Sequence, residues 1–227
     1  MASAHAFSFE PITQDYTPSG PGANHVFRVA NTSASRIAVR ISVRPRSIEP
    51  DGTEILGKEA DEFVVFPRQI LLDPGERRGI RVSWNGPASL EVERPFRVIA
   101  EQVPVAMGRD EPTQGGGIRL TYRYEGSIYV VPFGAESAVR VATVERVAGG
   151  LLVGIENTGT RRAILSSARL FVSGAGGSQS TIELGPAELP GLTGENMLAG
   201  ARRLFIVPAP AGLPDGPLTG RIVFDTR

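Results

Sequence analysis

Short runs of alternating apolar and polar residues, broken by Gly, Pro, Asn and Asp, recur along this chain and limit what it can fold into. Residues 37–44 give the clearest example, because Ile37, Val39, Ile41 and Val43 alternate with small or charged side chains. A period of two residues indicates a β-strand with one buried face. Helical periodicity is hard to find in the sequence, so we predict an all-β protein.

The predicted strands fall into two sets, which are separated by a break at Pro132, Phe133 and Gly134. Seven or eight strands precede this break, which is the strand count of an immunoglobulin-like sandwich. Similar strands follow it. A chain of 227 residues could form one large β-domain or two smaller ones. The break favours two immunoglobulin-like domains in tandem, at residues 7–133 and 134–227.

Composition excludes several classes of function. The formal net charge is zero, which disfavours nucleic acid and anionic lipid surfaces as partners. No apolar run reaches the roughly 18 residues that membrane insertion needs, and the absence of cysteine rules out disulfides and thiol chemistry. A Ser/His/Asp triad that uses His25 is formally open, but no catalytic, metal or cofactor motif is visible.

The first residues contain Ala4-His5-Ala6, which fits the small-residue pattern that ends a secretory signal peptide. The charged and apolar regions that normally precede this pattern are missing. We interpret the start as the remnant of a signal peptide, so that the mature chain begins at Phe7. Coincidence in an alanine-rich start would give the same pattern.

Residues 118–124 form the stretch on which the functional interpretation rests. Apolar or aromatic side chains at Ile118, Leu120, Tyr122 and Tyr124 alternate with polar ones, so they fall on one face of a strand. A run of glycines precedes this strand, which is typical of a loop. The alternation alone fits both an ordinary core strand and a strand that is kept for a partner.

Several short motifs follow one another in a specific order and spacing. They are Val26 to Asn31, Phe63 to Pro67, Leu72 to Gly75, Ile80 to Val82, Leu90 to Val98 and Glu101 to Pro104. Each motif is weak singly, but their order resembles that of the PapD-like periplasmic chaperones of the chaperone–usher pilus pathway. The resemblance covers nearly the whole chain.

This resemblance implies two sandwiches set at an angle, like a boomerang, and a role for the alternating stretch. Pilus subunits resemble immunoglobulin folds that lack their last strand, so each exposes a groove of core residues and an unpaired sheet edge. The chaperone lends a strand that completes the edge and fills the groove. This donor strand would lie near residues 118–131. The side chains that fill the groove, which we call its plugs, would be Ile118, Leu120, Tyr122 and Tyr124.

The family anchors the C-terminal carboxylate of the subunit with an arginine on the first strand and a lysine on the donor strand. The matching positions here carry Thr13 and Ser127, which departs from that pattern. Either this chain anchors its subunit differently, or the alignment is shifted by a residue or more. Lys58 is the only lysine, so a carboxylate would be bound by arginine, and Arg123 and Arg97 are the substitute candidates.

The resemblance also implies an ion network that fixes the angle between the two domains. Arg81 and Glu93 occupy the matching positions in the first domain, and Asp215 is the match in the second. Three unrelated surface charges, each contributing little to stability, would look the same in the sequence.

A member of this family would be a periplasmic chaperone without enzymatic activity or cofactor. It would bind pilus or fimbrial subunits and deliver them to an outer-membrane usher, and two free chains could cap each other's donor strand as a homodimer. The alternative is a tandem immunoglobulin-like adhesion or structural module in which residues 118–124 are simply core. A β-sandwich hydrolase is a third interpretation, and it would need a catalytic carboxylate pair that the sequence does not indicate.

Overall fold

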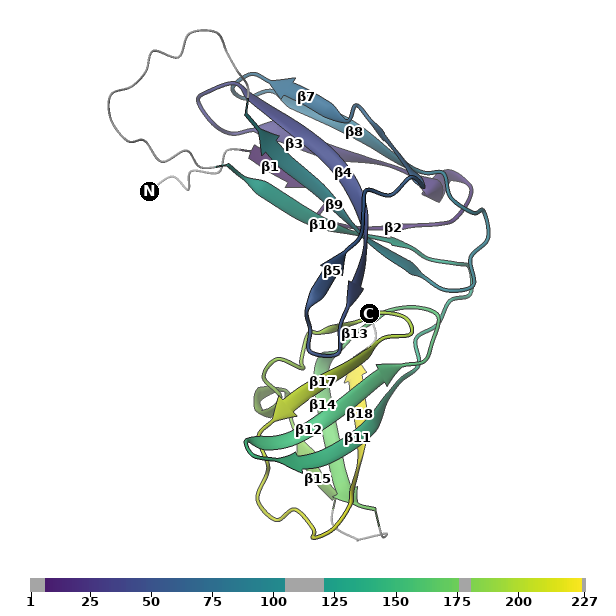
Figure 1. Ribbon diagram of the computed structural model, residues 1–227, viewed down its shortest axis with the longest axis vertical. Helices are drawn as coiled ribbons and strands as arrows, with labels where there is room; N and C mark the ends of the chain where they lie inside the picture. Colours follow the sequence, from purple (N-terminus) through teal and green to yellow (C-terminus); the bar gives the residue numbers. More distant parts are fainter. Residues whose placement is uncertain (1–6, 105–120, 176–180, 226–227) are drawn as a thin grey trace, which may run out of the picture. The chain divides into compact units, whose positions relative to one another are not determined.

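The computed structural model describes residues 7–104, 121–175 and 181–225, and Figure 1 shows that this part of the chain is built from β-strands. The strands up to the break at Pro132 are β1 (Phe7–Glu10), β2 (Thr13–Tyr16), β3 (Asn24–Asn31), β4 (Ile37–Ile48), β5 (Glu54–Leu56), β6 (Phe63–Phe66), β7 (Gln69–Leu72), β8 (Arg77–Trp84), β9 (Arg94–Val103) and β10 (Arg123–Val130). Those after it are β11 (Val139–Val147), β12 (Gly150–Asn157), β13 (Ala163–Ile164), β14 (Ser166–Gly174), β15 (Thr181–Leu184), β16 (Asn196–Met197), β17 (Arg202–Val207) and β18 (Leu218–Asp225). The all-β prediction is confirmed.

The helical content of the described ranges consists of two 3₁₀ turns, η1 (Pro21–Ala23) and η2 (Pro186–Glu188). Within those ranges, no helix is long and apolar enough to cross a membrane.

The chain divides into two compact units. The main division falls between Val131 and Pro132, beside the predicted break. Two short segments from the first part of the chain group with the second unit, namely Ser47–Ile55, which joins β4 to β5, and Glu91–Glu93, which leads into β9. The sequence does not indicate this assignment of the two segments.

Two sheets pack face to face around the core of the first unit. One has the strand order β1-β3-β8-β6, and the other has the order β2-β10-β9-β4-β5, with β7 paired to β4. The ring centroid of Phe63 lies 5.2 Å from that of Trp84 and 5.0 Å from that of Phe96, so aromatic rings fill the centre. The hydroxyl of Tyr16 donates a hydrogen bond to the carbonyl of Val82 at 3.0 Å, and burial raises the pKa of this phenol above its usual range.

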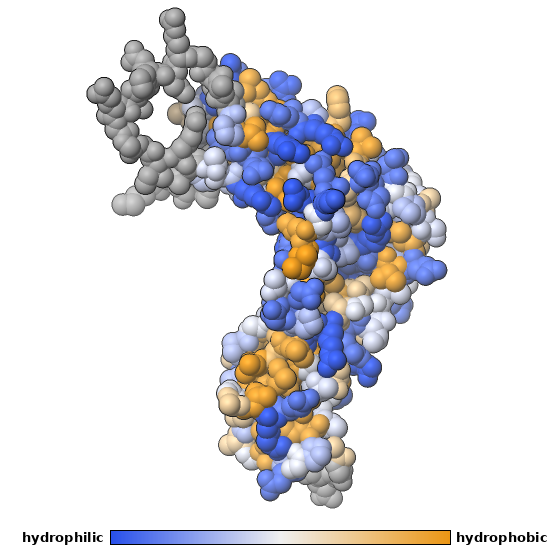
Figure 2. Space-filling view, in the orientation of Figure 1, coloured by the Kyte–Doolittle hydropathy of each residue, from blue (hydrophilic) through white to orange (hydrophobic). Residues whose placement is uncertain are grey.

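The second unit has a largely aliphatic core between a sheet of order β11-β12-β17 and a sheet of order β15-β14-β18, while β13 pairs with β16. On the outer face of the first of these sheets, Ile206 is 63% exposed and lies opposite Leu152. Figure 2 shows apolar surface gathered over β12 and β17.

Residues 45–61 are polar and rich in turn-forming residues, which predicts a segment without regular strands, and the structure corrects this prediction. β4 instead continues through Pro45 to Ile48. β9 pairs with it as far as Pro45, opposite Phe96, and β5 also pairs with β4 in the same sheet. β5 then follows within the same segment. The short strands β2 and β16 also have no signal in the sequence, since pairing with a neighbour rather than composition makes them strands.

Each unit has a buried asparagine that closes a turn, and the two asparagines make the same kinds of hydrogen bonds. Asn31, at the end of β3, is 1% exposed, and its Nδ2 donates to the carbonyls of Ser35 at 2.8 Å and Leu72 at 3.1 Å. Its Oδ1 accepts from the backbone N–H of Ser33 at 2.9 Å. Asn157, at the end of β12, makes the equivalent three bonds at 2.7, 3.1 and 3.1 Å. The two units therefore share the same hydrogen-bonded turn after the corresponding strand.

Replacing Asn31 with alanine should lower the free energy of unfolding of the first unit by roughly 2–4 kcal/mol, because buried carbonyls lose their donor. Urea denaturation followed through the fluorescence of Trp84, the only tryptophan, measures this change. Asn24→Ala removes an exposed asparagine from the same strand and should change the value by less than about 0.5 kcal/mol. Equal effects of the two substitutions would contradict the structural role of Asn31.

Candidate functional site

Strand β10 has a neighbour along its whole length on one side only. β9 pairs with all of it in antiparallel orientation. On the other side β2 pairs with it in parallel, and this pairing begins at Ser127 opposite Thr13. Among the described residues, no strand pairs with that second side of residues 123–126. This part of β10 is an open sheet edge.

The backbone of the open edge faces outward in a defined way. The carbonyl of Tyr122 accepts from the backbone N–H of Gln102 at 2.9 Å, so it faces β9. The N–H of Ser127 faces the other way and donates at 2.8 Å to the carbonyl of the residue that precedes β2. Alternate residues of an antiparallel strand turn their backbone groups to opposite neighbours. The N–H and C=O groups of Arg123 and Glu125 therefore face the open side.

The side chains next to this edge alternate as the sequence predicts. Tyr122 and Tyr124 are half-buried and pack against the core of the first unit, and the ring of Tyr124 meets that of Phe7 edge-on at 4.7 Å. Thr121 and Arg123 are exposed. The strand thus presents one aromatic and one polar face. The two other predicted plugs, Ile118 and Leu120, lie outside the described residues.

A row of polar side chains crosses four strands of the same sheet at one register. Thr13 of β2 lies opposite Ser127 of β10, Ser127 lies opposite Arg97 of β9, and Arg97 lies opposite Arg44 of β4. We call these four residues the polar row. Residues that lie opposite one another point to the same face of a sheet. Phe96, the neighbour of Arg97 along β9, faces the core, so the polar row points away from it.

Arg97 is the member of the polar row that the structure positions most firmly. Its Nη1 donates to Oγ of Ser127 at 2.7 Å, and Ser127 is 8% exposed. A guanidinium carries five N–H donors in a planar fork, which matches the geometry of a carboxylate. Arg44 is exposed beside it, and the sequence gives no signal for this residue because the pairing of β4 with β9 cannot be read from it. Arg123, the other candidate, forms an ion pair with Glu125 at 2.8 Å.

Glu93 is buried and has an ion-pair partner that the sequence does not single out. Nη1 of Arg162 lies 2.8 Å from Oε2 of Glu93, and the backbone N–H of Arg162 donates to Oε1 at 3.3 Å. Both residues belong to the second unit. Arg81 is exposed in β8 and Asp215 is exposed before β18. A network that joins these two residues to Glu93 stays a prediction.

The described part of the chain holds no group of three or more His, Cys, Asp and Glu side chains placed to bind a metal ion. Nε2 of His25 lies 3.0 Å from the carbonyl oxygen of Gly22, and its ring centroid lies 4.5 Å from that of Tyr16. These contacts are those of a structural side chain. The open edge of β10 and the polar row are the features of the first unit that suit a binding function.

Solved structures of pilus chaperones share this fold, although the sequence matches no family model and no curated protein. A chain of the CsuC–CsuE chaperone–tip subunit pre-assembly complex of archaic Csu pili from Acinetobacter baumannii aligns with a TM-score of 0.62 and 14% identity, covering 95% of this chain and 92% of that one. The class 5 fimbriae chaperone CfaA aligns with a TM-score of 0.60 and 16% identity, covering 97% of this chain and 99% of that one. A chain of the complex of Salmonella enterica SafA pilin with the SafB chaperone aligns with a TM-score of 0.58 and 15% identity. This alignment covers 100% of this chain and 93% of that one.

The alignments span nearly the full length of this chain and of the chaperones it resembles. At such low identities the likeness concerns the fold. The chain therefore has the PapD-like fold of the chaperones of pilus and fimbria assembly.

Proposed function

We propose that this protein is a periplasmic chaperone of pilus or fimbria assembly that acts without enzymatic chemistry. It would bind a subunit by donating the strand that begins near residue 118, and would deliver that subunit to an outer-membrane usher. The shared fold supports the proposal, since two of the similar structures are complexes of a chaperone with a pilin or a tip subunit. In the absence of a subunit, the same edge would let two copies cap each other as a homodimer.

The open edge of β10 carries the proposal. The backbone groups of Arg123 and Glu125 face the side of β10 that β2 pairs with only from Ser127 onward. An incoming strand can therefore extend the sheet beside these two residues. The aromatic face of Tyr122 and Tyr124 lies beside this edge. A subunit that lacks its last strand needs both a backbone partner and apolar side chains, and this segment offers both.

The burial states of the plugs decide how much each contributes to binding. A large apolar side chain contributes roughly 1.5–3 kcal/mol when it passes from full exposure to full burial. Tyr122 and Tyr124 already rest against the core of their own chain, so they have less surface left to bury. We therefore propose that the two tyrosines contribute less to subunit binding than a fully exposed apolar side chain would.

The polar row would replace the family's carboxylate anchor. Thr13 and Ser127 carry no charge, but Arg97 stands next to Ser127 with its guanidinium held by the serine hydroxyl, and Arg44 lies beside Arg97. A subunit carboxylate placed there would receive charge-assisted hydrogen bonds, each contributing about 1.5–3 kcal/mol. We propose Arg97 as the anchor of this chain.

Leu120→Asp should abolish recovery of a subunit while leaving the chain folded. The chain is expressed with a signal peptide in its native host and affinity-purified from the periplasm, and co-purifying proteins are identified by mass spectrometry. Wild type should recover a small subunit-like protein, and Leu120→Asp should lose it because a charge would enter the subunit groove. Thr121→Asp places the same charge on the opposite face and should retain the subunit.

Thermal unfolding of the purified variants separates donation from an ordinary core role. A Leu120→Asp variant that unfolds would contradict strand donation and favour the adhesion or structural module, in which this residue belongs to the core. Retention of the subunit by both variants would contradict the proposal as well.

Arg97→Gln should weaken binding of the recovered subunit about tenfold or more, because the carboxylate loses charge-assisted bonds. Arg28→Gln removes an exposed arginine from β3 in the other sheet and should leave the affinity unchanged. Titration of purified chain with the subunit, followed by calorimetry, gives both values. An unchanged affinity for Arg97→Gln would exclude Arg97 as the anchor.

A further inference from the structure

The second unit contains a pocket that takes no part in the proposed strand donation. Its volume is about 360 Å³, and residues 135–137, residues 161–164 and Phe224 of β18 line it. Pockets that bind small ligands have volumes of roughly 300–1,000 Å³. This pocket therefore suits a small molecule or the end of a peptide rather than a folded partner.

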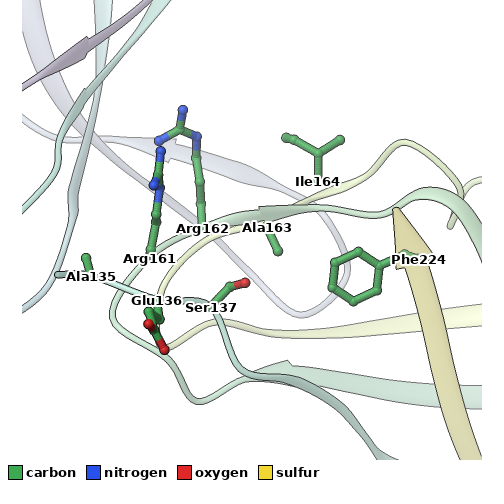
Figure 3. A pocket seen from close by; sticks show the side chains of 8 residues that line it. All are labelled: Ala135, Glu136, Ser137, Arg161, Arg162, Ala163, Ile164 and Phe224. Atoms are coloured by element: carbon green, nitrogen blue, oxygen red, sulfur yellow. The ribbon is translucent and has the colours of Figure 1, made fainter. Parts of the chain in front are cut away.

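Two arginines form one side of the pocket. Figure 3 shows the side chains of Arg161 and Arg162 standing side by side. Arg162 is held in place by the buried carboxylate of Glu93, since the side chain of Glu93 is 1% exposed and that of Arg162 is 14% exposed. The backbone N–H of Arg161 donates to the carbonyl of Glu136 at 3.1 Å, which fixes the chain beneath its side chain. Guanidinium groups are suited to a planar anion such as a carboxylate.

The other side of the pocket is apolar. Ile164 is 39% exposed although it is a large aliphatic residue, and Phe224 packs partly against the core of the second unit. Figure 3 shows these two side chains across the pocket from the arginines, with the hydroxyl of Ser137 between the two sides and the carboxylate of Glu136 directed away from the guanidinium groups. The pocket thus combines a cationic side, an apolar side and a hydroxyl.

We propose that this pocket binds the free carboxylate of a peptide C-terminus whose last side chain is apolar. The carboxylate would lie against Arg161 and Arg162, and the apolar side chain would cover Ile164 and Phe224. Inorganic phosphate could satisfy the arginines but would leave the apolar side in water. The combination of both sides therefore favours a peptide end over a simple anion.

The probe is a pentapeptide that ends in leucine with a free carboxylate, titrated into the ¹⁵N-labelled full chain and followed by NMR. Its binding should shift the amide signals of residues 135–137 and 161–164. The same peptide with a C-terminal amide should bind about tenfold more weakly or worse, because it lacks the charge. Arg161→Gln and Ile164→Asp should each weaken the free acid by a similar factor.

Arg169→Gln is the matched control for charge, because Arg169 is an exposed arginine of β14 in the same unit. Its Nη1 lies 3.6 Å from Oε1 of Glu183, so it forms an ion pair outside the pocket. It should leave binding unchanged. Equal binding of the acid and amide peptides, shifts confined to other residues, or displacement of the peptide by millimolar phosphate without any effect of Ile164→Asp would each overturn the proposal. Since every lining residue belongs to the second unit, failure here would leave the donor strand unaffected.

Discussion

The backbone of β10 needs a neighbour on both sides, and the chain supplies the second neighbour for only part of the strand. β1 pairs with β3 in one sheet, whereas β2 pairs with β10 in the other, so the N-terminal segment changes sheets at Pro11 and Ile12. Proline has no N–H to give to a strand ladder, which suits a break at this point. Because β1 pairs elsewhere, Arg123 and Glu125 keep an edge that a partner strand can complete.

An open edge beside aromatic side chains is also a risk, because it can pair with unrelated chains. Charged residues on edge strands oppose such pairing, and Arg123 and Glu125 are charged, exposed and joined by an ion pair. Tyr122 and Tyr124 rest against their own core, which limits the apolar surface that the free chain presents. The edge is therefore guarded against pairing with unrelated chains in the free protein, and it remains available to a strand that fits it.

Local alternation made the half-buried strands predictable, including the aromatic face of Tyr122 and Tyr124. The strand β2 could not be predicted, because only Tyr16 in it is buried and the pairing with β10 makes it a strand. The polar row depends on the register between strands far apart in the sequence, so the contact of Arg97 with Ser127 is visible only in the structure. The resemblance aligned Ser127 with an anchor position but could not supply its neighbours.

Amide hydrogen exchange of the chain, free and bound to its subunit, tests strand donation most directly. The N–H groups of Arg123 and Glu125 face the open side, whereas that of Tyr124 faces β9. Donation predicts that the amides of Arg123 and Glu125 exchange quickly in the free monomer and slow by about tenfold or more in the complex, while Tyr124 is protected in both. Exchange at Arg123 and Glu125 that is unchanged by the subunit would contradict strand donation.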